Sequence, residues 1–381
     1  MPSISKQATV MINPFLTFGY NGPAYFCDRT EETKRLTSLL TNGNHVALIS
    51  PRRMGKTGLI KHCFSQMQIQ KNYHLFFVDI YATRSEAEFT YKLGQSILSV
   101  LKSKGRKSWE RFIQVVASLR TGISLDAMGQ PNWNLEIGDI QTPQVTLDEI
   151  FQYLSKADKP CFVAIDEFQS IMDYPEKNVE ALLRTHIQDC NNAKFVFSGS
   201  KRHMMNEIFS SPARPFYQSA TILTLRPIPI EAYTPFIICH FESNGRRIDT
   251  DAIADLYHRF GGVTWYIQKI CNEVFAASDR GDSIGTPEID MAIRQVIDEK
   301  TDTFEDLMAR LTMKQRSLLK GLASEESLRP TSAAFIKKYH LTSPSTVQRI
   351  LTSMLDKDLI SYEGDHYFIH DYFFKYWLAR S

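Results

Sequence analysis

The sequence has no long apolar run, and its first residues do not show the pattern of a signal peptide. No uncharged apolar stretch reaches the ~20 residues that a helix needs to cross a bilayer. The first residues, MPSISKQATVMINPF, contain no basic segment followed by a long apolar core, which is the pattern of a signal peptide. We therefore expect a cytoplasmic protein that does not bind a membrane.

The sequence also lacks paired cysteines. Its six cysteines lie at long intervals, at Cys27, Cys63, Cys161, Cys190, Cys239 and Cys271. None belongs to a CxxC pair, and none has a neighbouring histidine at the spacing of a zinc site. We expect reduced thiols, most of them buried.

An excess of charge of one sign is absent as well. The formal net charge is +2, with 23% charged and 43% hydrophobic residues, so the composition does not identify a polyanionic partner. A local basic face could still bind nucleic acid, because binding depends on the side chains that touch phosphates. The length of 381 residues exceeds what one hydrophobic core usually organises, which predicts at least two domains.

Short apolar runs alternate with helical spacing in the first part of the chain. The runs are His45–Ile49, His74–Ile80, Cys161–Ile165, Lys194–Phe197 and Ala220–Leu225. The helical patterns between them include Lys56–Gln70, Leu147–Lys156 and Val179–Asp189. Because strands covered on both faces read as continuous apolar runs, this order predicts an α/β fold with a parallel sheet. An insertion at about 102–142, with alternating Gly122–Ala127, a turn at Gly129–Gln130–Pro131 and then Trp133–Ile137, predicts a small hairpin of unassigned function.

The second part of the chain changes character twice. Helical patterns come first, at Tyr233–Glu242, Thr250–Phe260, Val263–Phe275 and Pro287–Glu299, and predict a small helical lid. Three helices follow, at Lys314–Leu322, Thr331–Tyr339 and Ser345–Asp356, and then strands at Leu359–Tyr362 and His366–Ile369 around Glu363–Gly364–Asp365. Three helices and a two-stranded wing are the pattern of a winged helix-turn-helix.

A phosphate-binding motif lies between the first predicted strand and the helix after it, which is the context that a GxxxxGK[ST] match requires. Its residues, with the glycine that follows, are Ser50, Pro51, Arg52, Arg53, Met54, Gly55, Lys56, Thr57 and Gly58. Backbone N–H groups would wrap the β-phosphate, Lys56 would reach the β- and γ-phosphates, and the Thr57 hydroxyl would bind Mg²⁺. Ser50 replaces the first glycine, where a small residue can serve because the tightest approach is at Gly55. The alternative is a chance triplet that caps an ordinary helix.

An acidic pair ends the third predicted strand. Asp166 would hold Mg²⁺, and Glu167 would polarise the attacking water as general base. Alternatively, both carboxylates cap the following helix. The motif upstream favours the catalytic interpretation.

Five further side chains have two interpretations each. Arg53 is a solvated loop charge or an extra phosphate contact, and the same choice applies to Arg52. Ser198 and Ser200, after the next strand, either sense the γ-phosphate or form a turn. Arg214, in a proline-bounded loop, is an arginine finger or a surface arginine.

The order of these segments resembles the archaeal-type ATPases of the STAND and AAA+-like branch of P-loop ATPases. The segments are Phe26-Cys27-Asp28-Arg29-Thr30-Glu31-Glu32, Pro51 to Thr57, Ile165-Asp166-Glu167-Phe168-Gln169, Ser198-Gly199-Ser200 and Gly261-Gly262-Val263-Thr264-Trp265-Tyr266. The resemblance implies an AAA+-like P-loop NTPase sheet domain at 1–228, a helical lid at 229–303 and a winged-helix domain at 304–381.

The resemblance also implies roles for residues. The segment with Arg29 and Glu32 would lie near the adenine, and Thr264 stands where the lid motif GGxPxY usually has proline. ATP, in place of GTP, is implied by the resemblance alone. The aromatic segment Asp371–Trp377 resembles the tail that often follows the winged helix, or is a stripe that packs on the core.

Three functions fit the sequence. The first is a Mg²⁺-dependent ATPase that works as a switch, exchanges ATP and ADP, and controls a protein partner; an oligomer is compatible with it. The second is an ATP-regulated DNA-binding protein, although the candidate recognition helix Ser345–Asp356 carries one arginine and ends in an acid. The third is a nucleotide-binding scaffold without hydrolysis, which Glu167 argues against.

Overall fold

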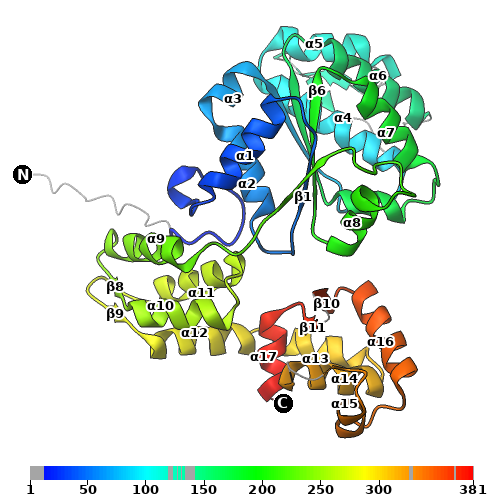
Figure 1. The fold of residues 1–381 in the computed structure, drawn as a ribbon. Helices are drawn as coiled ribbons and strands as arrows, with labels where there is room; N and C mark the ends of the chain where they lie inside the picture. The colour runs from blue at the N-terminus through cyan, green and yellow to red at the C-terminus, as the bar shows by residue number, and fades with distance from the viewer. Residues whose placement is uncertain are drawn as a thin grey trace, which may run out of the picture. The chain divides into compact units, whose positions relative to one another are not determined.

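The computed structural model describes residues 13–118, 123–126, 128–129, 131–133, 142–325, 329–363 and 366–380 (Figure 1). The chain forms two compact units. The first contains the residues through Phe236 and also Gly261–Lys269, and the second contains Ile237–Phe260 and the residues from Ile270 on. The predicted domain boundaries after residues 228 and 303 stay predictions.

A five-stranded parallel sheet forms the centre of the first unit and confirms the predicted fold class. Its strands are β1 (Val46–Ile49), β2 (His74–Asp79), β5 (Cys161–Asp166), β6 (Ala193–Gly199) and β7 (Thr221–Thr224), in the order β2-β5-β6-β1-β7. All neighbouring pairs are parallel. Each predicted run is a strand, with ends that differ by one or two residues. Because β6 separates β1 from β5, its carboxyl end lies between the loop after β1 and the acids at the end of β5.

Helices cover both faces of this sheet. They are η1 (Pro23–Tyr25), α1 (Thr30–Thr41), α2 (Lys56–Ser65), α3 (Met67–Asn72), α4 (Glu86–Ser103), α5 (Arg106–Val115), α6 (Pro143–Lys156), η4 (Phe168–Asp173), α7 (Val179–Asp189) and α8 (Arg202–Ser210). The prediction of one helix from Lys56 to Gln70 is wrong, because Gln66 adopts an extended backbone between α2 and α3. The Ser65 hydroxyl donates to the His62 carbonyl there, a local bond that competes with helix continuation.

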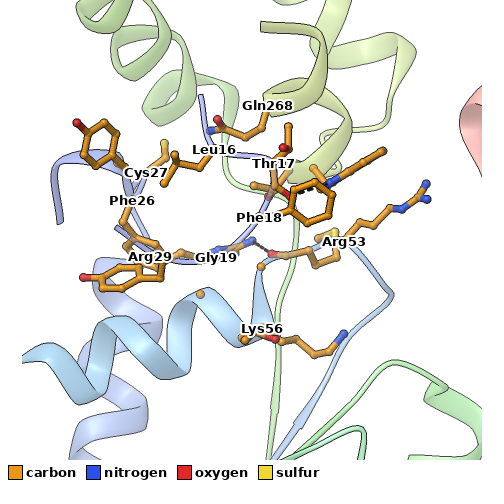
Figure 2. Close-up of a pocket in the computed structure, with 18 of the residues that line it drawn as sticks. Leu16, Thr17, Phe18, Gly19, Phe26, Cys27, Arg29, Arg53, Lys56 and Gln268 are labelled. Carbon is orange, nitrogen blue, oxygen red and sulfur yellow. Dashed lines mark hydrogen bonds between the residues drawn. The ribbon is translucent and has the colours of Figure 1, made fainter. Parts of the chain in front are cut away.

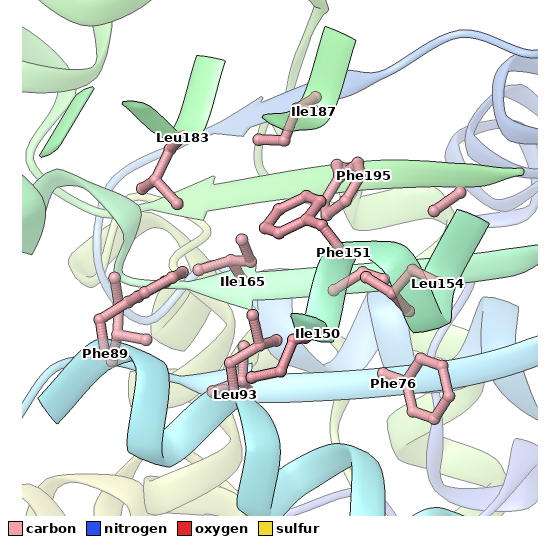
Figure 3. Packing of buried hydrophobic residues seen from close by; sticks show 14 of the residues in the cluster. Phe76, Phe89, Leu93, Ile150, Phe151, Leu154, Ile165, Leu183, Ile187 and Phe195 are labelled. Carbon is pink, nitrogen blue, oxygen red and sulfur yellow. The ribbon is translucent and has the colours of Figure 1, made fainter. Parts of the chain in front are cut away.

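Two apolar cores lie on opposite sides of the sheet. Val46 and Leu48 of β1 pack with α1 and α2, whereas Ala47 and Ile49 belong to the larger core on the other face. Figure 3 shows this larger core, where side chains of α4, α6 and α7 meet strands β2, β5 and β6. Alternate strand residues therefore point into different cores, and burial on both faces fixes the register of the sheet.

The insertion contains the predicted hairpin and one helix that the sequence analysis did not predict. Strands β3 (Ile123–Leu125) and β4 (Pro131–Trp133) pair antiparallel. Gly122, Ala127, Gln130 and residues 134–137, which belong to the same prediction, lie outside the described residues. The unpredicted helix α5 buries Trp109 and Phe112 in the larger core.

The predicted helical region and winged helix are both present. The helical region contains α9 (Ile230–Glu242), α10 (Thr250–Arg259), α11 (Thr264–Ala277), α12 (Thr286–Asp298) and the short parallel pair β8 (Arg247–Ile248) and β9 (Ser283–Ile284). The winged helix contains α13 (Thr301–Ala309), α14 (Met313–Ser324), α15 (Ala333–Lys338), α16 (Pro344–Asp356), β10 (Ile360–Glu363), β11 (His366–Ile369) and α17 (Tyr372–Arg380). Gly364 and Asp365, at the predicted tip of the wing, lie outside the described residues.

The aromatic tail forms α17 and packs on the core of the second unit. Phe373 and Phe374 are buried, and their rings contact Phe260 and Phe304. This packing confirms the interpretation of the tail as an aromatic stripe. The cysteines are free thiols, and five of the six are buried, as predicted. Among the described residues, no helix combines the length and the apolar character needed to span a bilayer.

Candidate functional site

The loop between β1 and α2 has the backbone that a phosphate-binding loop requires. Gly55 caps α2 in the left-handed region with φ +91°, and a Cβ built there would meet no atom within 4 Å. The space in front of it is therefore open, and only glycine adopts this conformation without strain. Ser50 is fully buried and is not among the residues with positive φ. A serine can stand at this position because its backbone does not need glycine.

Lys56 is a buried cation at the start of α2. Its Nζ donates to the carbonyl oxygens of Ser50 and Pro51, at 2.8 and 3.0 Å. Burial lowers the pKa of Lys56 to about 8 and Arg52 adds to this effect, while Glu167 and Asp166 oppose it. A phosphate placed near Nζ would stabilise the charged form that burial disfavours.

Thr57 and Asp166 meet although they come from different elements. The Thr57 hydroxyl, in the first turn of α2, donates to the Asp166 carboxylate at the end of β5, and the two oxygens are 2.6 Å apart. A hydroxyl and a carboxylate side by side are the hard oxygen donors that Mg²⁺ prefers, so this pair fits that ion.

Glu167 is held in place by residues of two neighbouring segments. Its backbone is left-handed, with φ +57°, and its Oε2 accepts from the Ser200 hydroxyl at 2.9 Å and from Gln169 Nε2 at 2.5 Å. Ser200 in turn accepts from Arg52 Nε at 3.3 Å. A polar chain thus connects the phosphate-binding loop to the carboxylate.

One cavity of about 400 Å³ collects most of these groups (Figure 2). Residues 16–21 and 25–27 form one side, residues 52–58 form the floor, and Glu167, Ile228, Thr264, Trp265 and Gln268 complete the lining. The lining is polar around Lys56 and largely apolar elsewhere. A cavity of this size with few, convergent polar groups is typical of a small-ligand site.

Arg29 links three segments beside this cavity. It is buried, and its guanidinium donates to Glu32 Oε1, to the Arg226 carbonyl and to the Met54 carbonyl, at 2.7, 2.6 and 3.2 Å. These bonds tie the start of α1 and the segment after β7 to the phosphate-binding loop. The hydrogen bonds to the two backbone carbonyls show that Arg29 also holds these segments together, in addition to its predicted position at the cavity.

The side chain of Arg53 extends from the loop and packs on aromatic rings. Its guanidinium carbon lies 4.2 Å from the centre of the Trp265 ring and 4.8 Å from that of Tyr266, and it donates a hydrogen bond to the Tyr266 hydroxyl. The Trp265 backbone N–H donates to the Arg53 carbonyl at 3.1 Å. Thr264, just before, lines the cavity, and its carbonyl accepts from the Tyr233 hydroxyl at 3.3 Å.

The predicted site residues divide into three groups. The cavity is lined by Arg29, Arg52, Arg53, Met54, Gly55, Lys56, Thr57, Gly58, Glu167 and Thr264. Ser50, Pro51 and Asp166 do not line it but bond to residues that do.

Ser198 and Arg214 form the third group, outside the two just described. Ser198 is fully buried in β6, and Ser200, the other candidate, is the serine that contacts Glu167. Arg214 forms ion pairs with Glu180 at 2.6 Å and Glu207 at 3.6 Å.

Sequence reasoning missed several groups in the cavity lining or in contact with it. Gln169 donates a hydrogen bond to Glu167. Its position two residues after that acid is the feature of the sequence that could have predicted this contact. Gln268 is buried, and within the described part of the chain its Oε1 has no hydrogen-bond partner. Neither Gln268 nor the lining residues 16–21 carried a motif.

Comparisons with known proteins agree with this geometry. A family model for the ATPase domain predominantly from Archaea matches residues 26–270, more than half of the 381 residues, and one for a probable winged helix domain matches residues 302–380. No curated protein matches the chain.

Two solved structures have a similar fold. The Walker-type ATPase of Pyrococcus abyssi is 17% identical, with a TM-score of 0.68 over 96% of this chain and 99% of that chain. The ORC2 protein of Aeropyrum pernix, solved as ADPNP and ADP complexes, is 14% identical, with a TM-score of 0.57 over 92% of each chain.

Proposed function

The chain belongs to the family of ATPase domains found predominantly in Archaea, and from this premise we propose that it is a Mg²⁺-dependent ATPase that works as a switch. The observation that carries the proposal is the convergence of Lys56, Thr57 and Glu167 on one cavity, with Asp166 bonded to Thr57. These groups supply a phosphate-binding cation, oxygen donors for a metal and a base.

Binding would use the loop and the start of α2. The backbone amides around Gly55 and the amino end of the helix favour an anion, and Lys56 would exchange its bonds with the Ser50 and Pro51 carbonyls for phosphate oxygens. Mg²⁺, held by Thr57 and Asp166, would neutralise phosphate charge when bound. The apolar part of the cavity would receive the base and ribose of ATP or ADP.

Hydrolysis would depend on Glu167. Its carboxylate is positioned by Ser200 and Gln169 and lines the cavity that contains Lys56. Placed there, it would orient a water molecule and accept its proton as the water attacks the γ-phosphate. For Arg214 to act as an arginine finger, its guanidinium would first have to leave Glu180 and Glu207, so that role stays a prediction.

Switching would use the helices that continue from the first unit into the second. Both α9 and α11 begin in the first unit and end in the second, and α11 begins with Thr264 and Trp265, which line the cavity. A change in the cavity on hydrolysis would therefore reach the second unit through continuous helices. We propose that the winged helix passes this change to a protein partner.

The Glu167→Gln substitution tests the catalytic part of the proposal. We expect it to retain ATP affinity and to lower turnover by about 10²-fold or more, because the amide cannot accept a proton. Phosphate release and nucleotide titration measure the two effects. Glu110→Gln, in an exposed ion pair on α5, is the matched control and should turn over ATP like the wild type. Wild-type turnover in Glu167→Gln would contradict the assignment.

A further inference from the structure

The side chain of Arg53 is engaged by aromatic residues that come from the start of α11. The guanidinium lies over both Trp265 and Tyr266, with a hydrogen bond to the Tyr266 hydroxyl, and the backbone at Arg53 accepts the Trp265 N–H. The Arg53 backbone is left-handed, with φ +70°. A non-glycine residue pays a strain cost in this region, so surrounding contacts must hold it there.

Trp265 is in turn a fixed wall of the cavity. Its indole Nε1 donates to the Thr17 carbonyl at 3.1 Å, and its ring meets the buried Tyr266 ring edge to face, with centres 5.2 Å apart. Both Thr17 and Trp265 line the cavity. The Trp265 ring is therefore held by the N-terminal segment, by Tyr266 and by Arg53.

The chemistry of this contact is specific to arginine. A planar guanidinium stacks on an aromatic face and donates in its own plane at the same time, whereas a lysine ammonium can do only one of these in a single position. The two interpretations open from the sequence, a solvated charge and a phosphate contact, do not include this arrangement. The stacked guanidinium contacts Trp265, which is part of the cavity wall.

We propose that Arg53 is a positioning residue. By fixing the Trp265 ring, its side chain couples the position of the cavity wall beside the base and ribose to the loop that would bind the phosphates. The inference rests on the proposed nucleotide binding. Because α11 carries Trp265 and continues beyond Lys269 into the second unit, Arg53 is also the first link from the loop to that helix. The ligand class is a nucleoside di- or triphosphate, and the γ-phosphate is not required.

A double-mutant cycle tests this inference. Mg²⁺-dependent affinity for ADP and for ATP is measured by calorimetry in wild type, Arg53→Ala, Trp265→Leu and the double variant. We expect each single substitution to weaken both nucleotides by about ten-fold, and the double variant to be no weaker than either single, because one interaction is lost in all three. Arg106→Ala and Trp377→Leu, in residues that do not line the cavity, are the matched controls.

Conservative variants separate positioning from phosphate binding. Trp265→Phe, which keeps an aromatic face, should bind nearly like wild type, and Arg53→Lys should not restore affinity. Thermal unfolding shows whether each variant is folded. If Arg53→Ala does not fold, the affinities of Trp265→Phe and Arg53→Lys test the inference in its place. Additive losses in the cycle, rescue by lysine, or a loss confined to ATP would overturn the inference. Absence of nucleotide binding by the wild type would refute the proposed function, and the inference with it.

Discussion

Burial and nearby carboxylates act in opposite directions on the pKa of Lys56. Its pKa of about 8 means that the ammonium begins to lose its proton just above neutral pH when no nucleotide is bound. A bound phosphate would favour the charged form of Lys56 and raise its pKa again. By linkage, binding above that pKa requires proton uptake, so affinity falls as pH rises through it.

The expected pH dependence is therefore one-sided. From about pH 7 to about pH 9.5, ATP affinity of the wild type should decrease above about pH 8, approaching ten-fold per pH unit. Lys56→Arg keeps its charge throughout and should lack this decrease, whatever its absolute affinity. Calorimetry across the pH range measures both. A flat profile for the wild type would contradict the assigned pKa.

Single residues differ in how far the sequence predicts them. The loop from Ser50 to Thr57 is local in the chain, so its motif predicts the phosphate contacts without any knowledge of long-range packing. The partner of Arg53 is Tyr266, 213 positions away, and no spacing rule connects the two. Long-range contacts of this kind depend on packing, which one sequence does not encode as a pattern.

At the scale of elements, the position of β6 assembles the edge of the sheet at which we propose catalysis. The apolar runs predict five strands, but they do not predict their order, since the order depends on which faces the helices cover. The observed order places the end of β6 between β1 and β5, and so brings Ser200 to Glu167. The sequence analysis left Ser198 and Ser200 as candidate sensors of the γ-phosphate, and that role stays a prediction; the topology brings Ser200 into contact with Glu167.

Gly199 at the end of β6 is a position where an added methyl group should be costly. A Cβ there would overlap with the side chains of Gln169 and Met205. We expect Gly199→Ala to lower the free energy of unfolding by about 1–3 kcal/mol and to reduce turnover, because Gln169, which donates to Glu167, must shift. Chemical denaturation and phosphate release measure the two effects.

The winged helix offers a matched control for this prediction. In Gly321→Ala, the added Cβ would overlap with Phe335, so a similar loss of stability is expected. Turnover per folded molecule should remain that of the wild type, because Gly321 is not one of the residues that line the cavity. Equal turnover losses in the two variants would mean that Gln169 does not position Glu167.

At the scale of the whole molecule, we expect the winged helix to bind a protein partner in preference to DNA. The sequence of α16 contains one cation, Arg349, and two nearby lysines are already bonded, Lys338 to Glu325 and Lys314 to Thr342. Few phosphate contacts predict weak binding with a shallow salt dependence. We therefore expect duplex DNA not to stimulate ATP turnover. Stimulation that disappears steeply with added salt would favour the DNA-binding alternative.

The whole account depends on a triphosphate site formed by Gly55, Lys56, Thr57 and Asp166. The most direct measurement is calorimetric titration of ATP into the purified protein, with Mg²⁺ and with a chelator, for the wild type and Lys56→Ala. We predict Mg²⁺-dependent binding by the wild type and its loss or severe weakening in Lys56→Ala. Equal affinity in both proteins, or no binding by the wild type, would contradict the account.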